Sequence, residues 1–381
     1  MPKLAPINPA VLAWALEESG MESDALAARS KIPPDRMIEF LDGSTRPTTT
    51  EFRALAGSLH RPLAFFFLPE PPEKADLLAA FRSGQPTKKS TIRPEERDAL
   101  RATSRWQEII SWIREKSSDP PLEIPRMPTG TRSADAAKII LHWLDWDSTA
   151  QRKATSSSAV LRMARARMEA RGVLLLQFSS LERNSCRGFL LPHDAAPVVA
   201  VNTKYNPAAR LFTVFHELAH LIRGDTAICD DPRSSSTERW CEQTAAQVLA
   251  PTDDLLPYLD RWVTTGKVTS IDDCRRIANR YKISLRAAAV RLISVERAES
   301  SLYSRIDRDT DFESGGPNPN AEPQTTPVRR VAALGNEIPR ELLRARDQGL
   351  LTTVQVRRYL NVDPDQLNDI SFRLQTADAE A

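Results

Sequence analysis

One stretch decides how the central part of this chain is interpreted: Leu211-Phe-Thr-Val-Phe-His216-Glu217-Leu-Ala-His220-Leu-Ile222. It contains the pattern H-E-x-x-H, and the spacing of its apolar residues predicts a helix. Residues four apart on a helix lie within about 40° of each other and about 6 Å along the axis. Both imidazoles can therefore bind one Zn²⁺ ion, and Glu217 on a neighbouring face can accept a proton from a water on the metal.

A third protein ligand is needed to complete such a zinc site. Residues 237–251 predict a later helix, on which Glu238 and Glu242 lie one turn apart. In gluzincins, which this arrangement resembles, the ligand Glu is followed four residues later by an acid or amide that orients a ligand His. By that similarity Glu238 is the ligand and Glu242 the orienting residue, while Cys241 is interpreted as a small buried apolar residue. Three other residues are alternatives for the third ligand: Asp225, Cys229 and Asp230.

Three apolar runs before the H-E-x-x-H helix predict strands over 173–178, 187–191 and 198–201. We expect 198–201 to be an edge strand, along which an extended substrate can pair. A zinc peptidase also needs a group that stabilises the oxyanion, usually His, Tyr or Arg. The sequence offers three candidates for it and does not choose between them: His193, Tyr205 and Arg210.

The first 70 residues predict short helices separated by tight turns. The stretches GMESDALAARSKIPPDRMIEFLDGSTRPT (20–48) and LAGSLHRPLAFFFLPEPP (55–72) resemble a Cro/C1-type (XRE-like) phage-repressor helix-turn-helix domain. In that family the third helix reads the major groove. Here the exposed face of that helix offers Pro34, Asp35, Arg36 and Glu39, two of which are acids. Residues 1–74 carry 8 Lys+Arg and 10 Asp+Glu, a net charge of −2, whereas phosphate contacts need cations. We therefore favour a docking module for a protein or for the peptidase domain itself, with DNA binding as the alternative.

The composition excludes several classes of protein. The 52 Lys+Arg and 50 Asp+Glu nearly balance, so the chain is neither a strongly basic nucleic-acid coat nor an acidic tail. Four Cys in 381 residues, with no C-x-x-C pair, exclude a disulfide scaffold. We find no signal peptide and no run of about 18 apolar residues, so we expect a cytoplasmic protein without a membrane partner.

A second resemblance joins these motifs. The segments NPAARLFTVFHELAHLI (206–222) and ERWCEQTAAQVLAP (238–251) resemble the ImmA/IrrE family of zinc metallopeptidases, and Phe81-Arg82-Ser83 matches a short element before that family's peptidase domain. The chain departs from the family pattern at Glu242, where the family usually has Asn. The resemblance implies specific cleavage of a partner repressor inside the cell, and an N-terminal helix-turn-helix domain is a common arrangement in the family.

The sequence thus predicts an α+β fold in which a zincin-like peptidase domain contains a small mixed sheet and the H-E-x-x-H helix. Arginines of the C-terminal region, among them Arg340 and Arg344, are interpreted as a solvated face. We expect a helix-turn-helix domain over 1–74, a linker over 75–95, the peptidase domain over 96–305, a linker over 306–327 and a small helical region over 328–381.

The expected function is that of a zinc endopeptidase that cleaves a protein substrate, with His216, His220 and Glu238 as metal ligands and Glu217 as general base. The alternative is a helix-turn-helix regulator that binds DNA or a partner repressor, in which the zincin domain senses without cutting.

Overall fold

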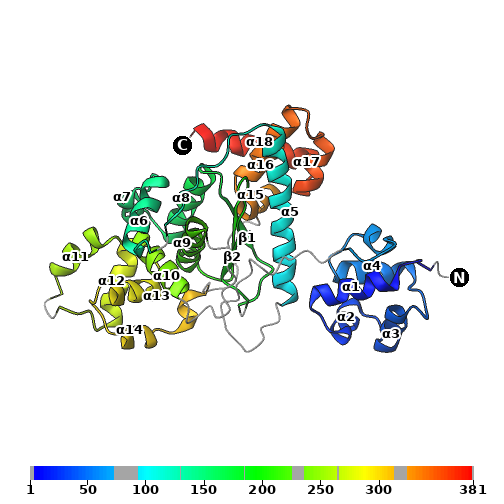
Figure 1. Cartoon of the computed structure of the whole chain (residues 1–381), viewed down its shortest axis with the longest axis horizontal. Helices are drawn as coiled ribbons and strands as arrows, with labels where there is room; N and C mark the ends of the chain where they lie inside the picture. The colour runs from blue at the N-terminus through cyan, green and yellow to red at the C-terminus, as the bar shows by residue number, and fades with distance from the viewer. Residues whose placement is uncertain are drawn as a thin grey trace. The chain divides into compact units, whose positions relative to one another are not determined.

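The computed structural model describes residues 4–72, 93–128, 130–183, 185–224, 236–263, 266–312 and 324–379 (Figure 1). The chain divides into two compact units, one formed by Met1–Leu78 with Thr87–Ala102 and the other by Ala79–Pro86 with Thr103–Ala381. The division falls inside helix α5 (Pro94–Lys116), whose two halves belong to different units.

The first unit is helical and has its own core. It contains α1 (Pro9–Ser19), α2 (Ser23–Ser30), α3 (Pro34–Asp42), α4 (Thr49–Ser58), η1 (Leu63–Phe67) and the start of α5. Its helix ends follow from local sequence: the Asn8 side chain accepts from Ala10 N at the start of α1, and Thr48 and Glu51 form a capping box on α4. The side chains that fill the core include Leu12, Leu26, Met37, Phe40, Leu55 and Phe66.

The second unit is built around a three-stranded mixed sheet in the order β1-β3-β2. Strand β1 (Leu174–Phe178) pairs in parallel with β3 (Val198–Asn202), and β2 (Gly188–Leu191) pairs with β3 in antiparallel fashion. The predominance of helices with this small sheet confirms the α+β class. The expectation that 198–201 is an edge strand was wrong, because β3 is paired on both sides and the edges are β1 and β2.

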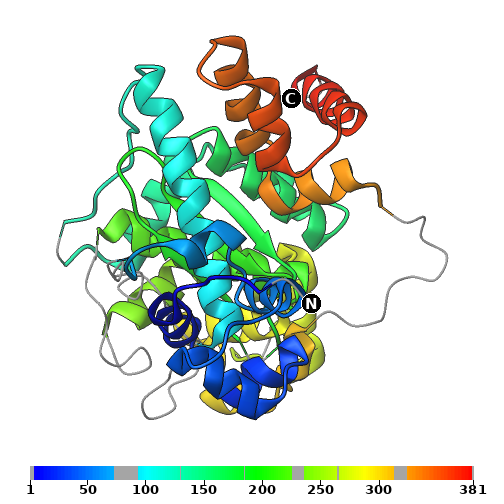
Figure 2. The ribbon, with the colours of Figure 1, turned by 90° about the vertical axis from the view of Figure 1, so that its right-hand side faces the viewer.

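Helices cover both faces of the sheet. In Figures 1 and 2, α8 (Ser157–Glu169) and α9 (Pro207–Arg223) lie on one side, and the second half of α5 lies on the other. The Gln107 side chain of α5 donates to Leu191 O and Ala196 O, both at 3.0 Å, which fixes this half of α5 to the loop between β2 and β3.

Further helices surround α9 and extend its core. They are α6 (Ser133–Trp143), α7 (Ser148–Lys153), α10 (Ser236–Leu249), α11 (Thr252–Asp260), α12 (Ile271–Tyr281), α13 (Leu285–Ser294) and α14 (Ser300–Ser304). The main core cluster draws its buried apolar side chains from Met127 through Ile306. No helix among the described residues is long and apolar enough to cross a membrane.

The segment that follows α14 packs against the start of α9, although its residues fall at the beginning of the expected linker 306–327. Helix η3 (Arg308–Asp311) places the fully buried Asp311 side chain 3.0 Å from Arg187 and 3.3 Å from Arg286. The Asn206 N–H donates to Asp311 O at 2.9 Å. Residues 313–323 of this expected linker, and most of the other at 75–95, lie outside the described residues.

The C-terminal helices belong to the second unit. They are α15 (Thr326–Leu334), α16 (Glu337–Asp347), α17 (Thr353–Leu360) and α18 (Pro364–Ala379). Helix α15 lies against β1, where the Gln177 side chain donates to Ala332 O at 2.9 Å. Arg344, one of the arginines interpreted as a solvated face, is half-buried and pairs with Asp119 and Glu341.

Gly188 permits the close approach of β2 to α9. A Cβ atom at this position would lie 2.6 Å from Ala200 O and 2.6 Å from Thr213 Cγ2 of α9. One contact is to backbone, so it cannot be relieved by a side-chain rotation. We expect Gly188→Ala to destabilise the second unit by about 1–3 kcal/mol in urea unfolding. Gly57→Ala, in a helix with nothing within 4 Å of its added Cβ, is the control and should leave stability unchanged or raise it slightly. Equal effects of the two variants would contradict the packing described.

Candidate metal centre

The helix that carries the H-E-x-x-H pattern has well-defined ends. The Asn206 side chain accepts from Ala209 N at 2.9 Å, Pro207 occupies the first turn, and Gly224 ends the helix in the left-handed region. Phe215 and Leu218 are fully buried in the core beneath it. These contacts orient α9 and leave His216 and His220 on the side that meets α10.

The two imidazoles and one carboxylate converge between α9 and α10. His216 Nε2 lies 3.1 Å from His220 Nε2, and the Glu238 carboxylate lies 3.2 Å from the first and 3.5 Å from the second. All three ligand atoms fall within 4.8 Å of one another. Donors about 2.1 Å from a tetrahedral zinc ion lie about 3.4 Å apart, so this donor set fits Zn²⁺. The structure brings together the three residues expected to hold the metal.

The imidazoles and the Glu238 carboxylate shift the pKa values of one another. Burial lowers the pKa of His216, but the hydrogen bond to Glu238 and the charges of Glu217 and Glu238 outweigh it and raise that pKa. Burial raises the pKa of Glu238, but hydrogen bonds with His216 and His220 hold it well below its usual range. Glu238 is therefore a carboxylate at neutral pH, as a metal ligand must be.

Glu217 follows His216 on α9 and is 5% exposed. Its negative charge helps to raise the pKa of His216, so the two side chains interact. The role of Glu217 as general base stays a prediction.

Cys241 is a site residue that sequence reasoning missed. Its fully buried Sγ atom lies 3.2 Å from His220 Nδ1. A metal-binding His usually donates its second ring N–H to a neighbouring group, which fixes the ring and its tautomer. The sulfur of Cys241 can accept that proton and leave His220 Nε2 free to bind the metal. The signal in the sequence was the position of Cys241, one turn after Glu238 on the same helix.

Glu242, the expected orienting residue, lies close to the cluster but is not bonded to it. Its side chain is exposed, and we find no hydrogen bond from it to another described residue. Its charge still contributes to the raised pKa of His216. The residue that contacts His220 Nδ1 is therefore Cys241 and not Glu242. Asp225, Cys229 and Asp230, the alternatives for the third ligand, lie outside the described residues, as do Phe81, Arg82 and Ser83.

The three oxyanion candidates are engaged elsewhere. His193 is exposed between β2 and β3, and its Nδ1 accepts from Ala195 N at 3.0 Å. The Tyr205 hydroxyl donates to Arg183 O at 3.3 Å, and Arg210 Nη1 donates to Gln177 Oε1 at 2.5 Å. These contacts give each residue a structural role and do not select one of them for catalysis.

Comparison with known proteins agrees with this geometry. Residues 169–293 match the model of the peptidase family M78, the IrrE N-terminal-like domain. No curated protein and no solved structure matches the chain. The matched segment contains β1–β3, α9 and α10, so it holds both helices of the candidate metal centre. For this segment the comparison confirms the resemblance to ImmA/IrrE metallopeptidases, and it extends to neither the N-terminal unit nor the C-terminal helices.

Proposed function

We propose that this chain is a zinc-dependent endopeptidase that cleaves a protein substrate. The observation that carries the proposal is the convergence of His216, His220 and Glu238 beside the buried Glu217. The match of this segment to a metallopeptidase family supports the same reaction class.

Each residue has a distinct role in this proposal. His216, His220 and Glu238 hold the zinc ion, and Cys241 fixes the ring of His220. Zinc supplies Lewis-acid activation of a water and of the scissile carbonyl. Glu217 accepts the proton of the attacking water and then donates it to the leaving amine. Because Glu217 is largely buried, its carboxylate is kept from bulk water during these transfers.

We further propose that the substrate is a repressor-type regulator and that cleavage takes place in the cytoplasm. This part rests on the resemblance to ImmA/IrrE peptidases. The surface of α3 favours a protein over DNA as the partner of the first unit. Arg36 donates to Glu51 at 2.9 and 3.1 Å, so its charge is neutralised within the unit. Ile38 is 57% exposed and Asp35 is exposed, and neither suits a phosphate backbone.

Replacement of the general base tests the mechanism. We expect Glu217→Gln to keep one zinc ion per chain but to lower cleavage of a co-expressed neighbouring repressor by about 10²–10⁴-fold, because the amide cannot accept a proton. Zinc is measured by elemental analysis and cleavage by mass spectrometry of the repressor. Glu115→Gln, on the exposed side of α5, is the control and should cleave normally. Full cleavage by Glu217→Gln would exclude this mechanism.

The contact between Cys241 and His220 predicts that Cys241 affects zinc affinity more than Glu242 does. We expect Cys241→Ala to weaken zinc binding about 10–100-fold, because His220 loses the acceptor for its second N–H. Cys241→Ser should restore part of this affinity, since a hydroxyl oxygen can accept the same proton. Glu242→Gln should change affinity less than Cys241→Ala, and His216→Ala should abolish binding. Competition with a chelator measures each dissociation constant, and a larger loss at Glu242 than at Cys241 would contradict the geometry.

A further inference from the structure

Two charged side chains of α8 meet the turn between α15 and α16. Arg165 donates to Ala332 O at 2.8 Å and to Ala333 O at 3.2 Å, at the C-terminal end of α15. Asn336 N, at the start of α16, donates to Glu169 Oε2 at 3.3 Å. The Arg165 cation at the C-terminus of α15 is stabilised by the helix dipole, and Glu169 accepts an N–H at the start of α16 that has no partner within the helix. The pair on α8 therefore holds one end of each helix.

Gly335 makes this contact possible. Its φ of +81° and ψ of −175° are accessible to glycine and strained for other residues. A Cβ atom added to Gly335 would lie 1.9 Å from Glu169 Oε1, so any side chain would collide with the carboxylate. Only glycine at position 335 therefore lets the turn approach Glu169 of α8 this closely.

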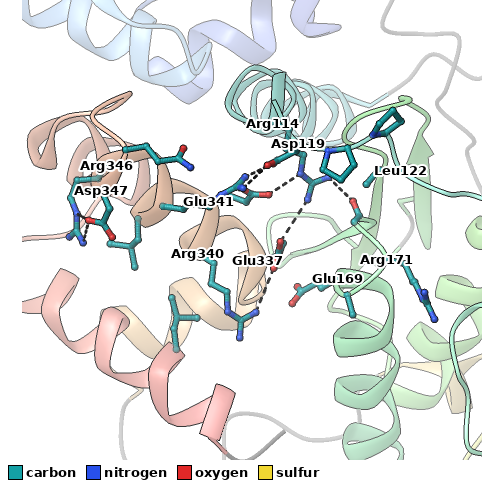
Figure 3. Close-up of a pocket in the computed structure, with 18 of the residues that line it drawn as sticks. Arg114, Asp119, Leu122, Glu169, Arg171, Glu337, Arg340, Glu341, Arg346 and Asp347 are labelled. Carbon is teal, nitrogen blue, oxygen red and sulfur yellow. Dashed lines mark hydrogen bonds and ion pairs between the residues drawn. The ribbon is translucent and has the colours of Figure 1, made fainter. Parts of the chain in front are cut away.

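A second set of ion pairs joins α16 to α5 (Figure 3). Arg114 donates to Glu341 at 2.9 Å, and both side chains are buried. Arg114 also donates to Gly172 O at 2.9 Å and to Ala195 O at 2.7 Å, at residues that lead into β1 and β3. These pairs border a cavity of about 900 Å³ lined by α5, α8, α16 and α18. Buried apolar residues of the hairpin, among them Leu334, Ile338 and Leu342, add to these ion pairs, so polar contacts and apolar packing together hold it in place.

The same hairpin is connected to the metal-binding helix through β1. Ala332 O accepts from the Gln177 side chain at 2.9 Å, and Gln177 Oε1 in turn accepts from Arg210 Nη1. Arg210 lies near the start of α9, the helix that carries His216 and His220. One hydrogen-bonded chain therefore runs from the end of α15 to α9.

We propose that the hairpin of α15 and α16 is a docked brace that orders the metal-binding helix α9 through Gln177 and Arg210, and that its docking is controlled by protonation of Glu169. The brace orders α9 whether or not a metal is bound. It gives a role to the C-terminal region, which lies outside the segment that matches the peptidase family.

The surroundings of Glu169 explain the dependence on protonation. Burial is the largest influence on the pKa of Glu169 and raises it, as does the charge of Glu337 on α16. The charges of Arg165 and Arg340 and the hydrogen bond from Asn336 N lower it, and the pKa that results is about 7. The docked state therefore binds a proton more tightly than an undocked state, in which the pKa would be near 4.5. Docking is favoured at low pH and weakens as the pH rises from about 4.5 to about 7.

The substitution Gly335→Ala, which adds a side chain that collides with Glu169, tests the brace in the full-length chain. We measure hydrogen exchange of the metal-free Gly335→Ala protein. We expect its α15 and α16 to lose protection, and α9 to lose protection together with them. Zinc affinity should fall several-fold. Gly349→Ala is the matched control, because Gly349 also has a positive φ of +76° but nothing within 4 Å of an added Cβ. A hairpin that opens while α9 stays fully protected would overturn the brace, and so would a hairpin that stays docked in Gly335→Ala.

A second variant tests the connection if Gly335→Ala does not fold. Gln177→Ala removes the link and should reduce protection of α9 while the hairpin stays docked. Gln375→Ala, on the exposed side of α18, is its control and should change neither. Unchanged α9 protection in Gln177→Ala would also overturn the proposal. Because exchange is measured without metal, a wild-type chain that binds no zinc would count against the proposed peptidase function and not against the brace.

Protonation control has its own test. The opening equilibrium of the hairpin, from exchange corrected for the intrinsic rate, should shift toward opening by about tenfold or more between pH 5.5 and pH 8. Glu169→Gln mimics the protonated carboxyl and should largely abolish this shift. Glu115→Gln should keep it. A wild-type hairpin with no pH dependence, or one whose dependence persists in Glu169→Gln, would exclude Glu169 as the controlling group.

Discussion

The packing of α10 against α9 is the constraint on which the candidate metal centre depends. A single helix can align His216 and His220, because residues four apart share a face, but it cannot supply the third ligand. The third ligand comes from α10, where Glu238 lies 3.2 and 3.5 Å from the two imidazoles. Cys241 and Ala245, small and fully buried, lie one turn apart on α10 and allow a short distance between helices. Cys241 therefore serves both the packing and the orientation of His220.

The parts of the site that the sequence predicted are those set by local spacing. The H-E-x-x-H helix follows from a period of 3.6 residues, and its ends follow from Asn206, Pro207 and Gly224. Glu238 required similarity to known metallopeptidases, since no local rule selects it. Glu242 was expected to orient a ligand His by similarity to gluzincins, in which an acid or amide follows the ligand Glu by four residues. The contact instead depends on how α10 is rotated against α9, and helix packing sets that rotation rather than residue type.

Non-local pairing explains what the sequence did not predict in the fold. All three strands are apolar and largely buried, so their composition did not indicate that β3 would be central. Arg114 and Glu341 are 227 residues apart, and nothing near Glu341 in the sequence indicates its partner. Likewise, the start of the expected linker 306–327 is held in place by the ion pair between Asp311 and Arg187, which lies 124 residues earlier. A buried ion pair adds little stability but favours one arrangement, because a misplaced charge would be left without its partner.

The two halves of α9 are fixed by different parts of the chain. Its second half carries the ligands and contacts α10. Its first turn is held by residues far along the sequence: Thr310 O accepts from the Asn206 side chain at 2.7 Å, and Arg210 is held through Gln177. Metal ligands must be placed to within about 0.5 Å, and a helix moves largely as a rigid body. Support at the first turn therefore bears directly on the positions of His216 and His220. This is a physical reason for η3 and the C-terminal helices to pack onto the same unit as the candidate metal centre.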